Sequence, residues 1–346
     1  MSEQYLNTKK EYIAVDFAKF VAALFVVAIH IPPFKDVAPG FSYEFQQVFC
    51  RMAVPFFFLC TGFFVGEKVQ SWGKIKSYLL HIIKMYTIWT LFYFYPMLER
   101  FWMPERAVSQ NVLELLQRFF LIGSYIQLWY LQATIVAVVL LFLCTAVCRM
   151  RERTVVVFAL VIYLVGVLGN SYRHAFDGMP AVVTLIRQYQ SLFFMTRNGV
   201  FFGFPFVTAG YLIFMHRDKI RQRAYAGMAV VFLTGMFLEE RLVNGIFGGA
   251  SHDMYLLTPA VAISLFLAIV FIPMPQSCRQ TGKLLRSIST YIFLLHILIN
   301  FYLKKLLLLV NLKMDYSLTH YTVITVLSIA AGALIYHIKG KNIKKV

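Results

Sequence analysis

One apolar segment of the chain, residues 14–31, contains both a lysine and a histidine. Lys19 and His30 are eleven positions apart, and in an α-helix this spacing places both side chains on one face, about 16 Å apart along the axis. A cation and an imidazole are costly inside a membrane-length helix unless they serve a function. His30 can act as a general base on a hydroxyl or carry an acyl group, and Lys19 can pair with a phosphate. Since an extended pantetheine arm has a comparable length, a coenzyme A thioester can lie between them.

Both residues also have an ordinary structural interpretation. His30 can be a packing histidine that is hydrogen-bonded to a neighbouring helix. Lys19 can extend its ammonium group toward the membrane surface and pair with Asp16, one turn away. The alignment of both side chains on one helix face favours the functional interpretation, and the residues alone leave the structural one open.

Three arginines stand close to the predicted outer ends of apolar segments. Arg51 opens the apolar run 52–60, Arg197 opens a phenylalanine-rich run, and Arg241 follows a third apolar run. Arginines at such depths need carboxylate, phosphate or carbonyl partners. The alternative is that each arginine is an interfacial anchor. The candidate partners on the same side are Glu239, Glu240, His252 and Asp253.

These candidate partners flank a glycine-rich stretch, residues 244–250. A carboxylate beside a histidine raises the basicity of the imidazole, so Glu239 or Asp253 is a candidate catalytic partner for His30. The alternative is an ordinary solvated loop. His296, in a later apolar segment, is on its own more typical of a structural histidine.

The composition predicts the elements that must position these residues. Hydrophobic residues make up 60% of the 346 residues and charged residues 14%, with a mean hydropathy of +0.68, whereas soluble domains have about 25% charged residues. We therefore expect an all-α, polytopic membrane bundle that forms a single domain over residues 1–346. Windows of membrane-spanning length predict ten helices, near residues 13–31, 46–66, 78–98, 126–147, 154–172, 194–214, 225–242, 254–272, 288–309 and 320–338.

The net charge of +17 is better explained by topology than by nucleic-acid binding. If the N-terminus is cytoplasmic, more of the lysines and arginines fall in short inside loops, such as 149–153 and 217–223, than in outside segments. Lysine and arginine concentrate in cytoplasmic loops of membrane proteins. We expect both termini to be cytoplasmic, the lipid bilayer to be the partner of the apolar surface, and no nucleic-acid partner.

Other features narrow the possible chemistry. The five cysteines have no metal-binding spacing, so we expect neither a metal cofactor nor a disulfide framework. Phosphate-binding glycine loops, GxSxG elbows and HExxH motifs do not occur in the sequence. Apolar spacing over residues 111–120 predicts a short helix lying on the membrane surface, and the longer outside connectors point to recognition of an acceptor or solute on that side.

Four segments resemble motifs of one family. Residues 16–23 followed by 26–30 are similar to the first helix of the membrane acyltransferase-3 family, in which a basic residue and a histidine are typically separated by ten residues. Residues 51–58 with 61–63 resemble its second helix, and 128–131 and 291–296 fit later motifs. The resemblance covers nearly the whole chain in order.

The resemblance implies a reaction and a location. Members transfer an acyl group, usually acetyl, from cytoplasmic acyl-CoA to a hydroxyl of a glycan or other envelope acceptor outside the bacterial cytoplasmic membrane. Lys19 takes the place of the usual arginine near the donor, which keeps the charge but loses the bidentate fork, and His30 takes the place of the essential histidine. We expect Lys74 and Lys76 to help hold the donor. The residues expected to bind the acceptor are Arg51, Trp129, Arg197, Asn198, Glu240 and His252.

A second resemblance supports a different hypothesis. Residues 196–202 and 252–256, with Pro259, resemble the membrane domain of vancomycin-resistance serine racemases, which is thought to move serine across the membrane for a fused racemase. The alternative function is therefore an amino-acid transport module without catalysis. Arg51 or Arg197 would hold the substrate carboxylate, and Glu239, Glu240 or Asp253 its ammonium group. Expected further partners are a second copy of the chain, a separate racemase or an envelope-synthesis enzyme.

Overall fold

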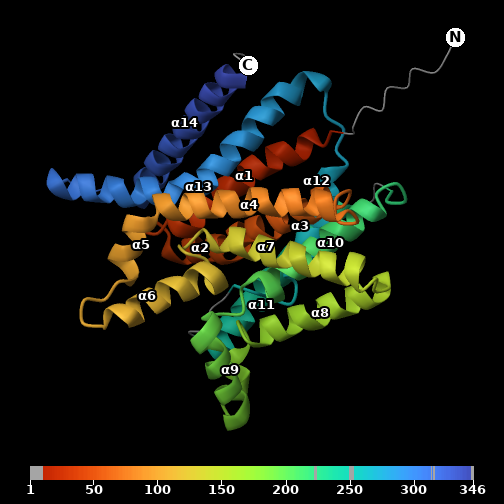
Figure 1. Ribbon diagram of the computed structural model, residues 1–346, viewed down its shortest axis with the longest axis horizontal. Coiled ribbons are helices and arrows are strands. Elements are labelled where there is room, and N and C mark those ends of the chain that lie inside the picture. The colour runs from red at the N-terminus through yellow and green to blue at the C-terminus, as the bar shows by residue number, and fades with distance from the viewer. Residues whose placement is uncertain (1–10, 222–223, 249–252, 313, 315, 344–346) are drawn as a thin grey trace.

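The computed structural model describes residues 11–221, 224–248, 253–312, 314 and 316–343 (Figure 1). Within these residues the chain forms helices and no strands, which confirms the predicted all-α class. His252, one of the residues expected to bind the acceptor, lies outside the described residues.

The helices follow one another with short connections. The first half of the chain contains α1 (Ile13–His30), α2 (Pro39–Glu44), α3 (Ala53–Val65), α4 (Trp72–Phe92), α5 (Phe94–Phe101), α6 (Val108–Gln117) and α7 (Trp129–Phe142). The second half contains α8 (Glu152–Leu168), α9 (Pro180–Phe193), α10 (Phe204–Met215), α11 (Tyr225–Phe247), α12 (Thr258–Val270), α13 (Arg279–Leu309) and α14 (Ser317–Ile343). Short π- and 3₁₀-helical turns extend several of these helices, including η1 (Phe45–Phe49), η2 (Cys50–Met52), η3 (Arg118–Ile122) and η6 (Gly199–Gly203).

Each of the ten predicted spans overlaps one of these helices. Among the described residues, five helical segments are long and apolar enough to cross a membrane: Ile13–His30, Pro39–Val65, Trp129–Val147, Gln276–Leu309 and Ser317–Lys339. Two shorter helices, Gly199–Met215 and Thr258–Val270, are also strongly apolar. The chain is therefore a multi-pass membrane protein, while the count of ten crossings and the sides of the termini stay predictions.

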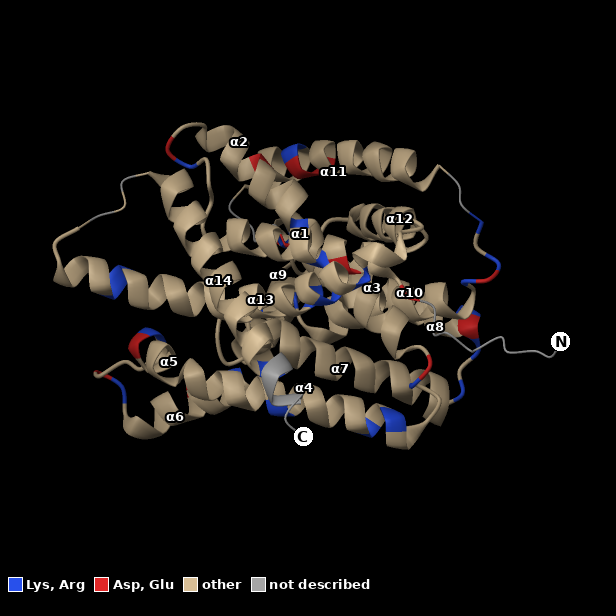
Figure 2. Ribbon diagram, turned by 90° about the horizontal axis from the view of Figure 1, so that it is seen from above, with Lys and Arg blue, Asp and Glu red and all other residues tan. Residues whose placement is uncertain are grey.

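The first helix lies inside the bundle. α1 packs along α13, which in turn packs along α14, and α1 also contacts α3 (Figure 1). Lysine, arginine, aspartate and glutamate lie mostly in loops and at helix ends, and a small group of both signs lies at the centre near α1 and α3 (Figure 2). The central charges mark the part of the bundle where the sequence places its candidate functional residues.

The long connectors contain more helix than the sequence predicts. The expected surface helix at 111–120 is α6 continued by η3, and it begins earlier, at Val108. Asn111 faces inward in this helix: it is buried and exchanges hydrogen bonds with the backbone N–H and carbonyl oxygen of Met103. The connector 173–193 contains α9, which was not predicted. Val182, Ile186, Tyr189 and Phe193 recur at helical spacing, so the sequence did carry a signal for this helix, although no residue of α9 is buried.

α3 and α10 approach each other closely through two glycines. A Cβ atom at Gly62 would overlap the backbone carbonyl of Val207, and one at Gly210 would overlap the carbonyl of Leu59. Small residues allow helix backbones in membranes to pack at this distance, where dispersion contacts replace the missing hydrophobic driving force. The close contact of α3 with α10 at these two glycines therefore sets the position of α3, which follows Arg51.

We expect Gly62→Val to lower the free energy of unfolding by about 3 kcal/mol, because the side chain must push α10 away from α3. The measurement is thermal unfolding of the purified protein in detergent. Gly227→Ala is the matched control, since a Cβ at Gly227 in α11 meets no atom within 4 Å and alanine favours the helix. Equal melting temperatures of the two variants would contradict the close contact.

Candidate functional site

Two cavities open along α1, one at each end of the Lys19–His30 face. The first, here called the Lys19 cavity, has a volume of about 370 Å³ and is lined by Lys19, Lys68 and Arg286 together with aromatic and aliphatic side chains. The second, the His30 cavity, has a volume of about 30 Å³ and is lined by His30, Arg51, Arg197 and Asp253 among others. The second volume is on the scale of one or two water molecules. The two residues predicted to act at the ends of one helix face therefore each line a cavity.

The Lys19 cavity is positively charged. The Lys19 ammonium lies 4.5 Å from the centroid of the Phe64 ring, and the Lys68 ammonium lies 5.2 Å from that of Tyr78. Arg286 forms an ion pair with Asp16 at 3.5 Å, so one carboxylate stands against three cations. Such a cavity can accept phosphate groups at its charged wall and an apolar or amide-containing chain along its aromatic wall.

One aromatic side chain belongs to the linings of both cavities and packs against two others. Phe293 lines both cavities, and its ring centroid lies 6.4 Å from that of Phe57 and 5.4 Å from that of Tyr130. The Tyr130 hydroxyl is 3.3 Å from the Thr61 hydroxyl. These three rings, here called the aromatic partition, lie where the two linings share Phe293.

His30 is the last residue of α1, and two other segments hold it. The Gln46 side-chain amide donates a hydrogen bond to the carbonyl oxygen of Ile29, which ties the end of α1 to η1. The His296 ring of α13 lies beside His30, with ring centroids 5.3 Å apart. His296 is fully buried, and its Nδ1 lies 2.9 Å from the Ile292 carbonyl oxygen. Nδ1 therefore carries a proton, and Nε2, which has no hydrogen-bond partner among the described residues, can only accept one.

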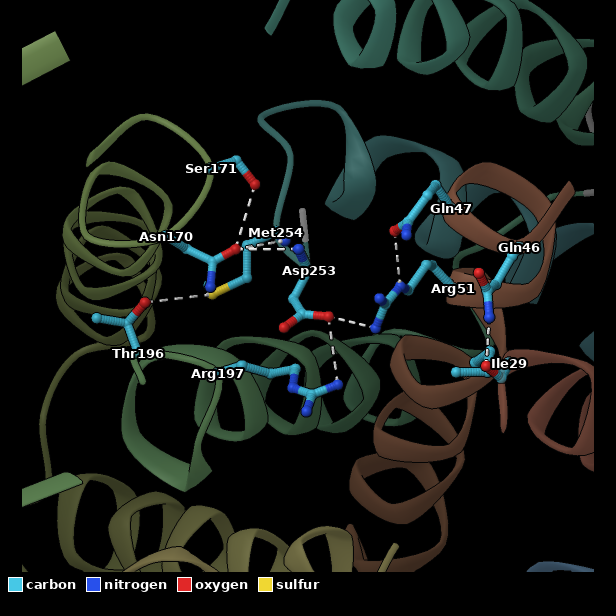
Figure 3. Close-up of polar contacts among 10 residues, drawn as sticks. All are labelled: Ile29, Gln46, Gln47, Arg51, Asn170, Ser171, Thr196, Arg197, Asp253 and Met254. Carbon is cyan, nitrogen blue, oxygen red and sulfur yellow. Dashed lines mark hydrogen bonds and ion pairs between the residues drawn. The ribbon is translucent and has the colours of Figure 1, made fainter. Parts of the chain in front are cut away.

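In the wall of the His30 cavity, two arginines share one carboxylate (Figure 3). Oδ1 of Asp253 pairs with a guanidinium nitrogen of Arg51 and, at 3.3 Å, with one of Arg197. Arg51 also donates from Nε to the Gln47 side-chain oxygen at 3.2 Å, and the Arg197 guanidinium stacks 4.6 Å above the Trp129 ring. Two cations and one anion leave a net positive charge, so this wall attracts a carboxylate or a developing negative charge.

Buried side chains fix the backbone around these groups. The Asn170 side-chain oxygen accepts from the N–H groups of Asp253 and Met254 at 3.0 and 3.1 Å (Figure 3). Glu239 accepts from the N–H groups of Leu256 and Leu257, just before α12, and from the Tyr172 hydroxyl. These contacts hold the segment that carries Asp253, which gives Glu239 a positioning role.

The structure brings five of the predicted residues into one cavity: His30, Arg51, Trp129, Arg197 and Asp253. The Asp253 carboxylate, which was expected beside His30, is paired with Arg51 and Arg197. The ring beside His30 is that of His296. Arg241, the third arginine of the sequence, lies apart from this cavity and pairs with Glu44.

The other predicted residues lie outside both cavity linings. Asn198 caps η6 by accepting from Val200 and Phe201 N–H groups. Glu240 is buried near Tyr43, and Glu239 has the contacts described above. Lys74 and Lys76 are exposed on the first turns of α4. The catalytic role of Glu239 and the ligand-binding roles of the other four stay predictions.

Sequence reasoning missed several residues that the structure places at the cavities. Lys68 and Arg286 line the Lys19 cavity, and Gln127 lines the His30 cavity. Gln127 directly precedes the segment 128–131, and His296 ends the segment 291–296. Both residues could therefore have been selected from the sequence because they lie at or beside these motifs. Among the described residues, no group of three or more His, Cys, Asp or Glu side chains could hold a metal ion.

Comparison with known proteins identifies related chains. A family model described as an acyltransferase domain matches residues 12–337. An amino-acid racemase of Enterococcus faecalis is 30% identical over 330 residues, which cover 86% of this chain and 46% of the relative. A serine/alanine racemase of Enterococcus gallinarum is 27% identical over 298 residues, 82% of this chain and 40% of the relative. The chain thus spans less than half the length of these relatives, and no solved structure matches it.

We expect Asp253→Asn to lower the free energy of unfolding by about 3 kcal/mol, since it leaves the Arg51 and Arg197 charges without their shared partner. The Arg51 and Arg197 side chains are only 18% and 21% exposed, so water can compensate only in part. Thermal and urea unfolding in detergent measure the change. Glu44→Gln is the control, because Arg241 in that ion pair is 60% exposed and the loss there should stay below about 1 kcal/mol. A similar loss in both variants would show that the Asp253 pair is not structurally important.

Proposed function

Because this chain belongs to the acyltransferase-3 family, we propose that it transfers an acyl group from acyl-CoA to a hydroxyl of an acceptor outside the cytoplasm. The observation that carries this proposal is the pair of cavities along α1, a positively charged one at Lys19 and a small one at His30, which share Phe293 of the aromatic partition in their linings. This arrangement suits a donor and an acceptor that enter from different ends and react between them. The proposed membrane is the bacterial cytoplasmic membrane, and the proposed acceptor class is an envelope glycan or similar molecule.

The donor would occupy the Lys19 cavity. Lys19, Lys68 and Arg286 would pair with the phosphates of coenzyme A, and the pantetheine arm would follow the cavity wall to the aromatic partition. The thioester would then lie beside Phe293, at the edge of the His30 cavity. The small volume of the His30 cavity favours a short acyl group, so we propose acetyl as the group transferred.

His30 would be the general base. The neighbouring His296 offers only an acceptor nitrogen, so it would hold an N–H of His30 and leave the other His30 nitrogen free to take the proton of the acceptor hydroxyl. Fixing the tautomer through the second nitrogen is a general way to orient a catalytic imidazole. Arg51 and Arg197 would hold the acceptor or stabilise the negative charge that develops in the transition state.

We expect His30→Ala to reduce acyl transfer by about 10²–10⁴-fold, the contribution of a general base, without loss of folding. The measurement is incorporation of radiolabelled acetyl from acetyl-CoA into the envelope fraction of bacterial membranes that contain the protein. His81→Ala is the control, because His81 is exposed on α4 and lines neither cavity. Full activity of the His30 variant, together with no binding or hydrolysis of acetyl-CoA by the purified protein, would rule out the proposed reaction.

We expect Lys19→Ala to weaken acetyl-CoA binding about tenfold, because one charge-assisted contact with a phosphate is lost. A thermal-shift titration in detergent with acetyl-CoA measures this, and desulfo-CoA tests whether the thioester is needed for binding. Lys84→Ala is the matched control, since Lys84 is an exposed lysine of α4 outside the cavity lining. Equal affinity in the wild type and the Lys19 variant would place the donor elsewhere.

A second candidate function is transport of an amino acid such as serine. It is favoured by the names of the racemase relatives and by the net positive charge of the Arg51–Asp253–Arg197 group, which suits a substrate carboxylate. The test is uptake of radiolabelled serine by proteoliposomes and stabilisation by serine in the absence of coenzyme A. Saturable uptake that acetyl-CoA does not affect, without any acyl transfer, would favour transport over catalysis.

A further inference from the structure

Gln127 is a buried amide without a hydrogen-bond partner at the edge of the proposed reaction site. Its side chain is 1% exposed, and neither Oε1 nor Nε2 makes a hydrogen bond of normal geometry with the described residues. The Tyr93 hydroxyl approaches it. That hydroxyl donates to the Leu294 carbonyl and accepts from the Leu298 N–H, so it can take at most one of the two N–H groups of Nε2 and can give nothing to Oε1. Gln127 lines the same small cavity as His30 and Arg197.

A buried amide that lacks partners is unfavourable, because it has lost its hydrogen bonds to water and gained none in the protein. Such a group is explained when a ligand or a bound water completes its hydrogen bonds. The cavity has room for a small group at this position, so the unpaired amide points to a ligand rather than to a packing role.

The other polar groups of the cavity narrow what this ligand group can be. Asp253 can only accept hydrogen bonds and is shared by Arg51 and Arg197, and His30 is the proposed base. In the described lining of the His30 cavity, the buried donors without a hydrogen-bond partner of normal geometry are the Gln127 amide and Nε of Arg197. Two such donors on residues that line one small cavity fit an oxygen atom that gains negative charge during a reaction.

Resting on the proposed function, we propose that Gln127 is a catalytic residue that donates a hydrogen bond from Nε2 to the carbonyl oxygen of the acyl group. When the acceptor oxygen attacks the thioester carbon, its proton passes to His30, and the carbonyl electron pair moves to the oxygen held by Gln127 and Arg197. When the C–S bond breaks, the coenzyme A thiolate leaves and takes the proton from His30. The products are an ester and free coenzyme A.

Gln132 provides a matched control in the same region of the chain. It is also a buried glutamine, 8% exposed, but its Nε2 donates to the Phe120 carbonyl oxygen at 3.0 Å, and it lines neither cavity. Replacing Gln132 with leucine leaves that carbonyl unpaired, whereas replacing Gln127 with leucine removes two polar atoms that had no partner. The two substitutions should therefore change stability and activity in opposite ways.

The experiment compares Gln127→Leu and Gln132→Leu in detergent and in membranes. We expect Gln127→Leu to keep or raise the melting temperature of the ligand-free protein and to lower the rate of acetyl transfer at saturating acetyl-CoA by about 10²–10³-fold. The affinity for acetyl-CoA in a thermal-shift titration should change only a few-fold. Gln132→Leu should lower the melting temperature and keep the transfer rate per folded molecule.

A second variant separates shape from hydrogen-bond donation. Gln127→Met has a similar length and no N–H to donate, so we expect transfer to be lost as in Gln127→Leu. Wild-type transfer rates in either folded variant, or a rate loss explained entirely by weaker acetyl-CoA binding, would overturn the role of Gln127 alone. Absence of acyl transfer by the wild type would overturn the proposed function and this inference with it.

Discussion

A single carboxylate, Asp253, neutralises one of two guanidinium groups in a part of the bundle where unpaired charge is strongly disfavoured. Arg51 comes from the turn before α3, Arg197 from the segment before η6, and Asp253 from the segment before α12. The folded bundle must bring these three segments together, and it does so with supporting hydrogen bonds from Asn170 and Glu239. One positive charge remains after this pairing, so the part of the His30 cavity that these three residues line is suitable for an anion.

The same region shows how helix packing creates two chemically different environments along one helix. α1 is enclosed by α13 and α3, so its polar face can open only into the spaces left between these helices. At the Lys19 end the space is large and carries several cations, and at the His30 end it is small and polar. Phe293 lines both, and it packs against Phe57 and Tyr130. A long charged donor and a small reacting group have different spatial requirements, and the two cavities match that difference.

Much of this arrangement could be predicted from local sequence. Each of the ten apolar windows overlaps a helix of the structure. The windows work because the membrane requires about 20 apolar residues for each crossing. The spacing of Lys19 and His30 placed them on one face, since helix geometry depends only on the number of residues between them. The arginines were expected to need carboxylate partners, and Asp253 was among the candidates for them. Contacts between residues distant in the chain, such as His30 with His296, could not be predicted because they depend on how the helices are packed.

By itself, the sequence determined the all-helical membrane class, the shared face of Lys19 and His30, and the family motifs, because these depend on composition and short-range periodicity. Only the tertiary structure decided that Asp253 pairs with Arg51 and Arg197, that Glu239 supports the start of α12, and that Gln127 is buried without a partner. The physical reason is that a polar side chain has the same sequence signature whether its hydrogen bonds are complete or not. Whether it is satisfied depends on which other segments the fold brings within about 3 Å of it.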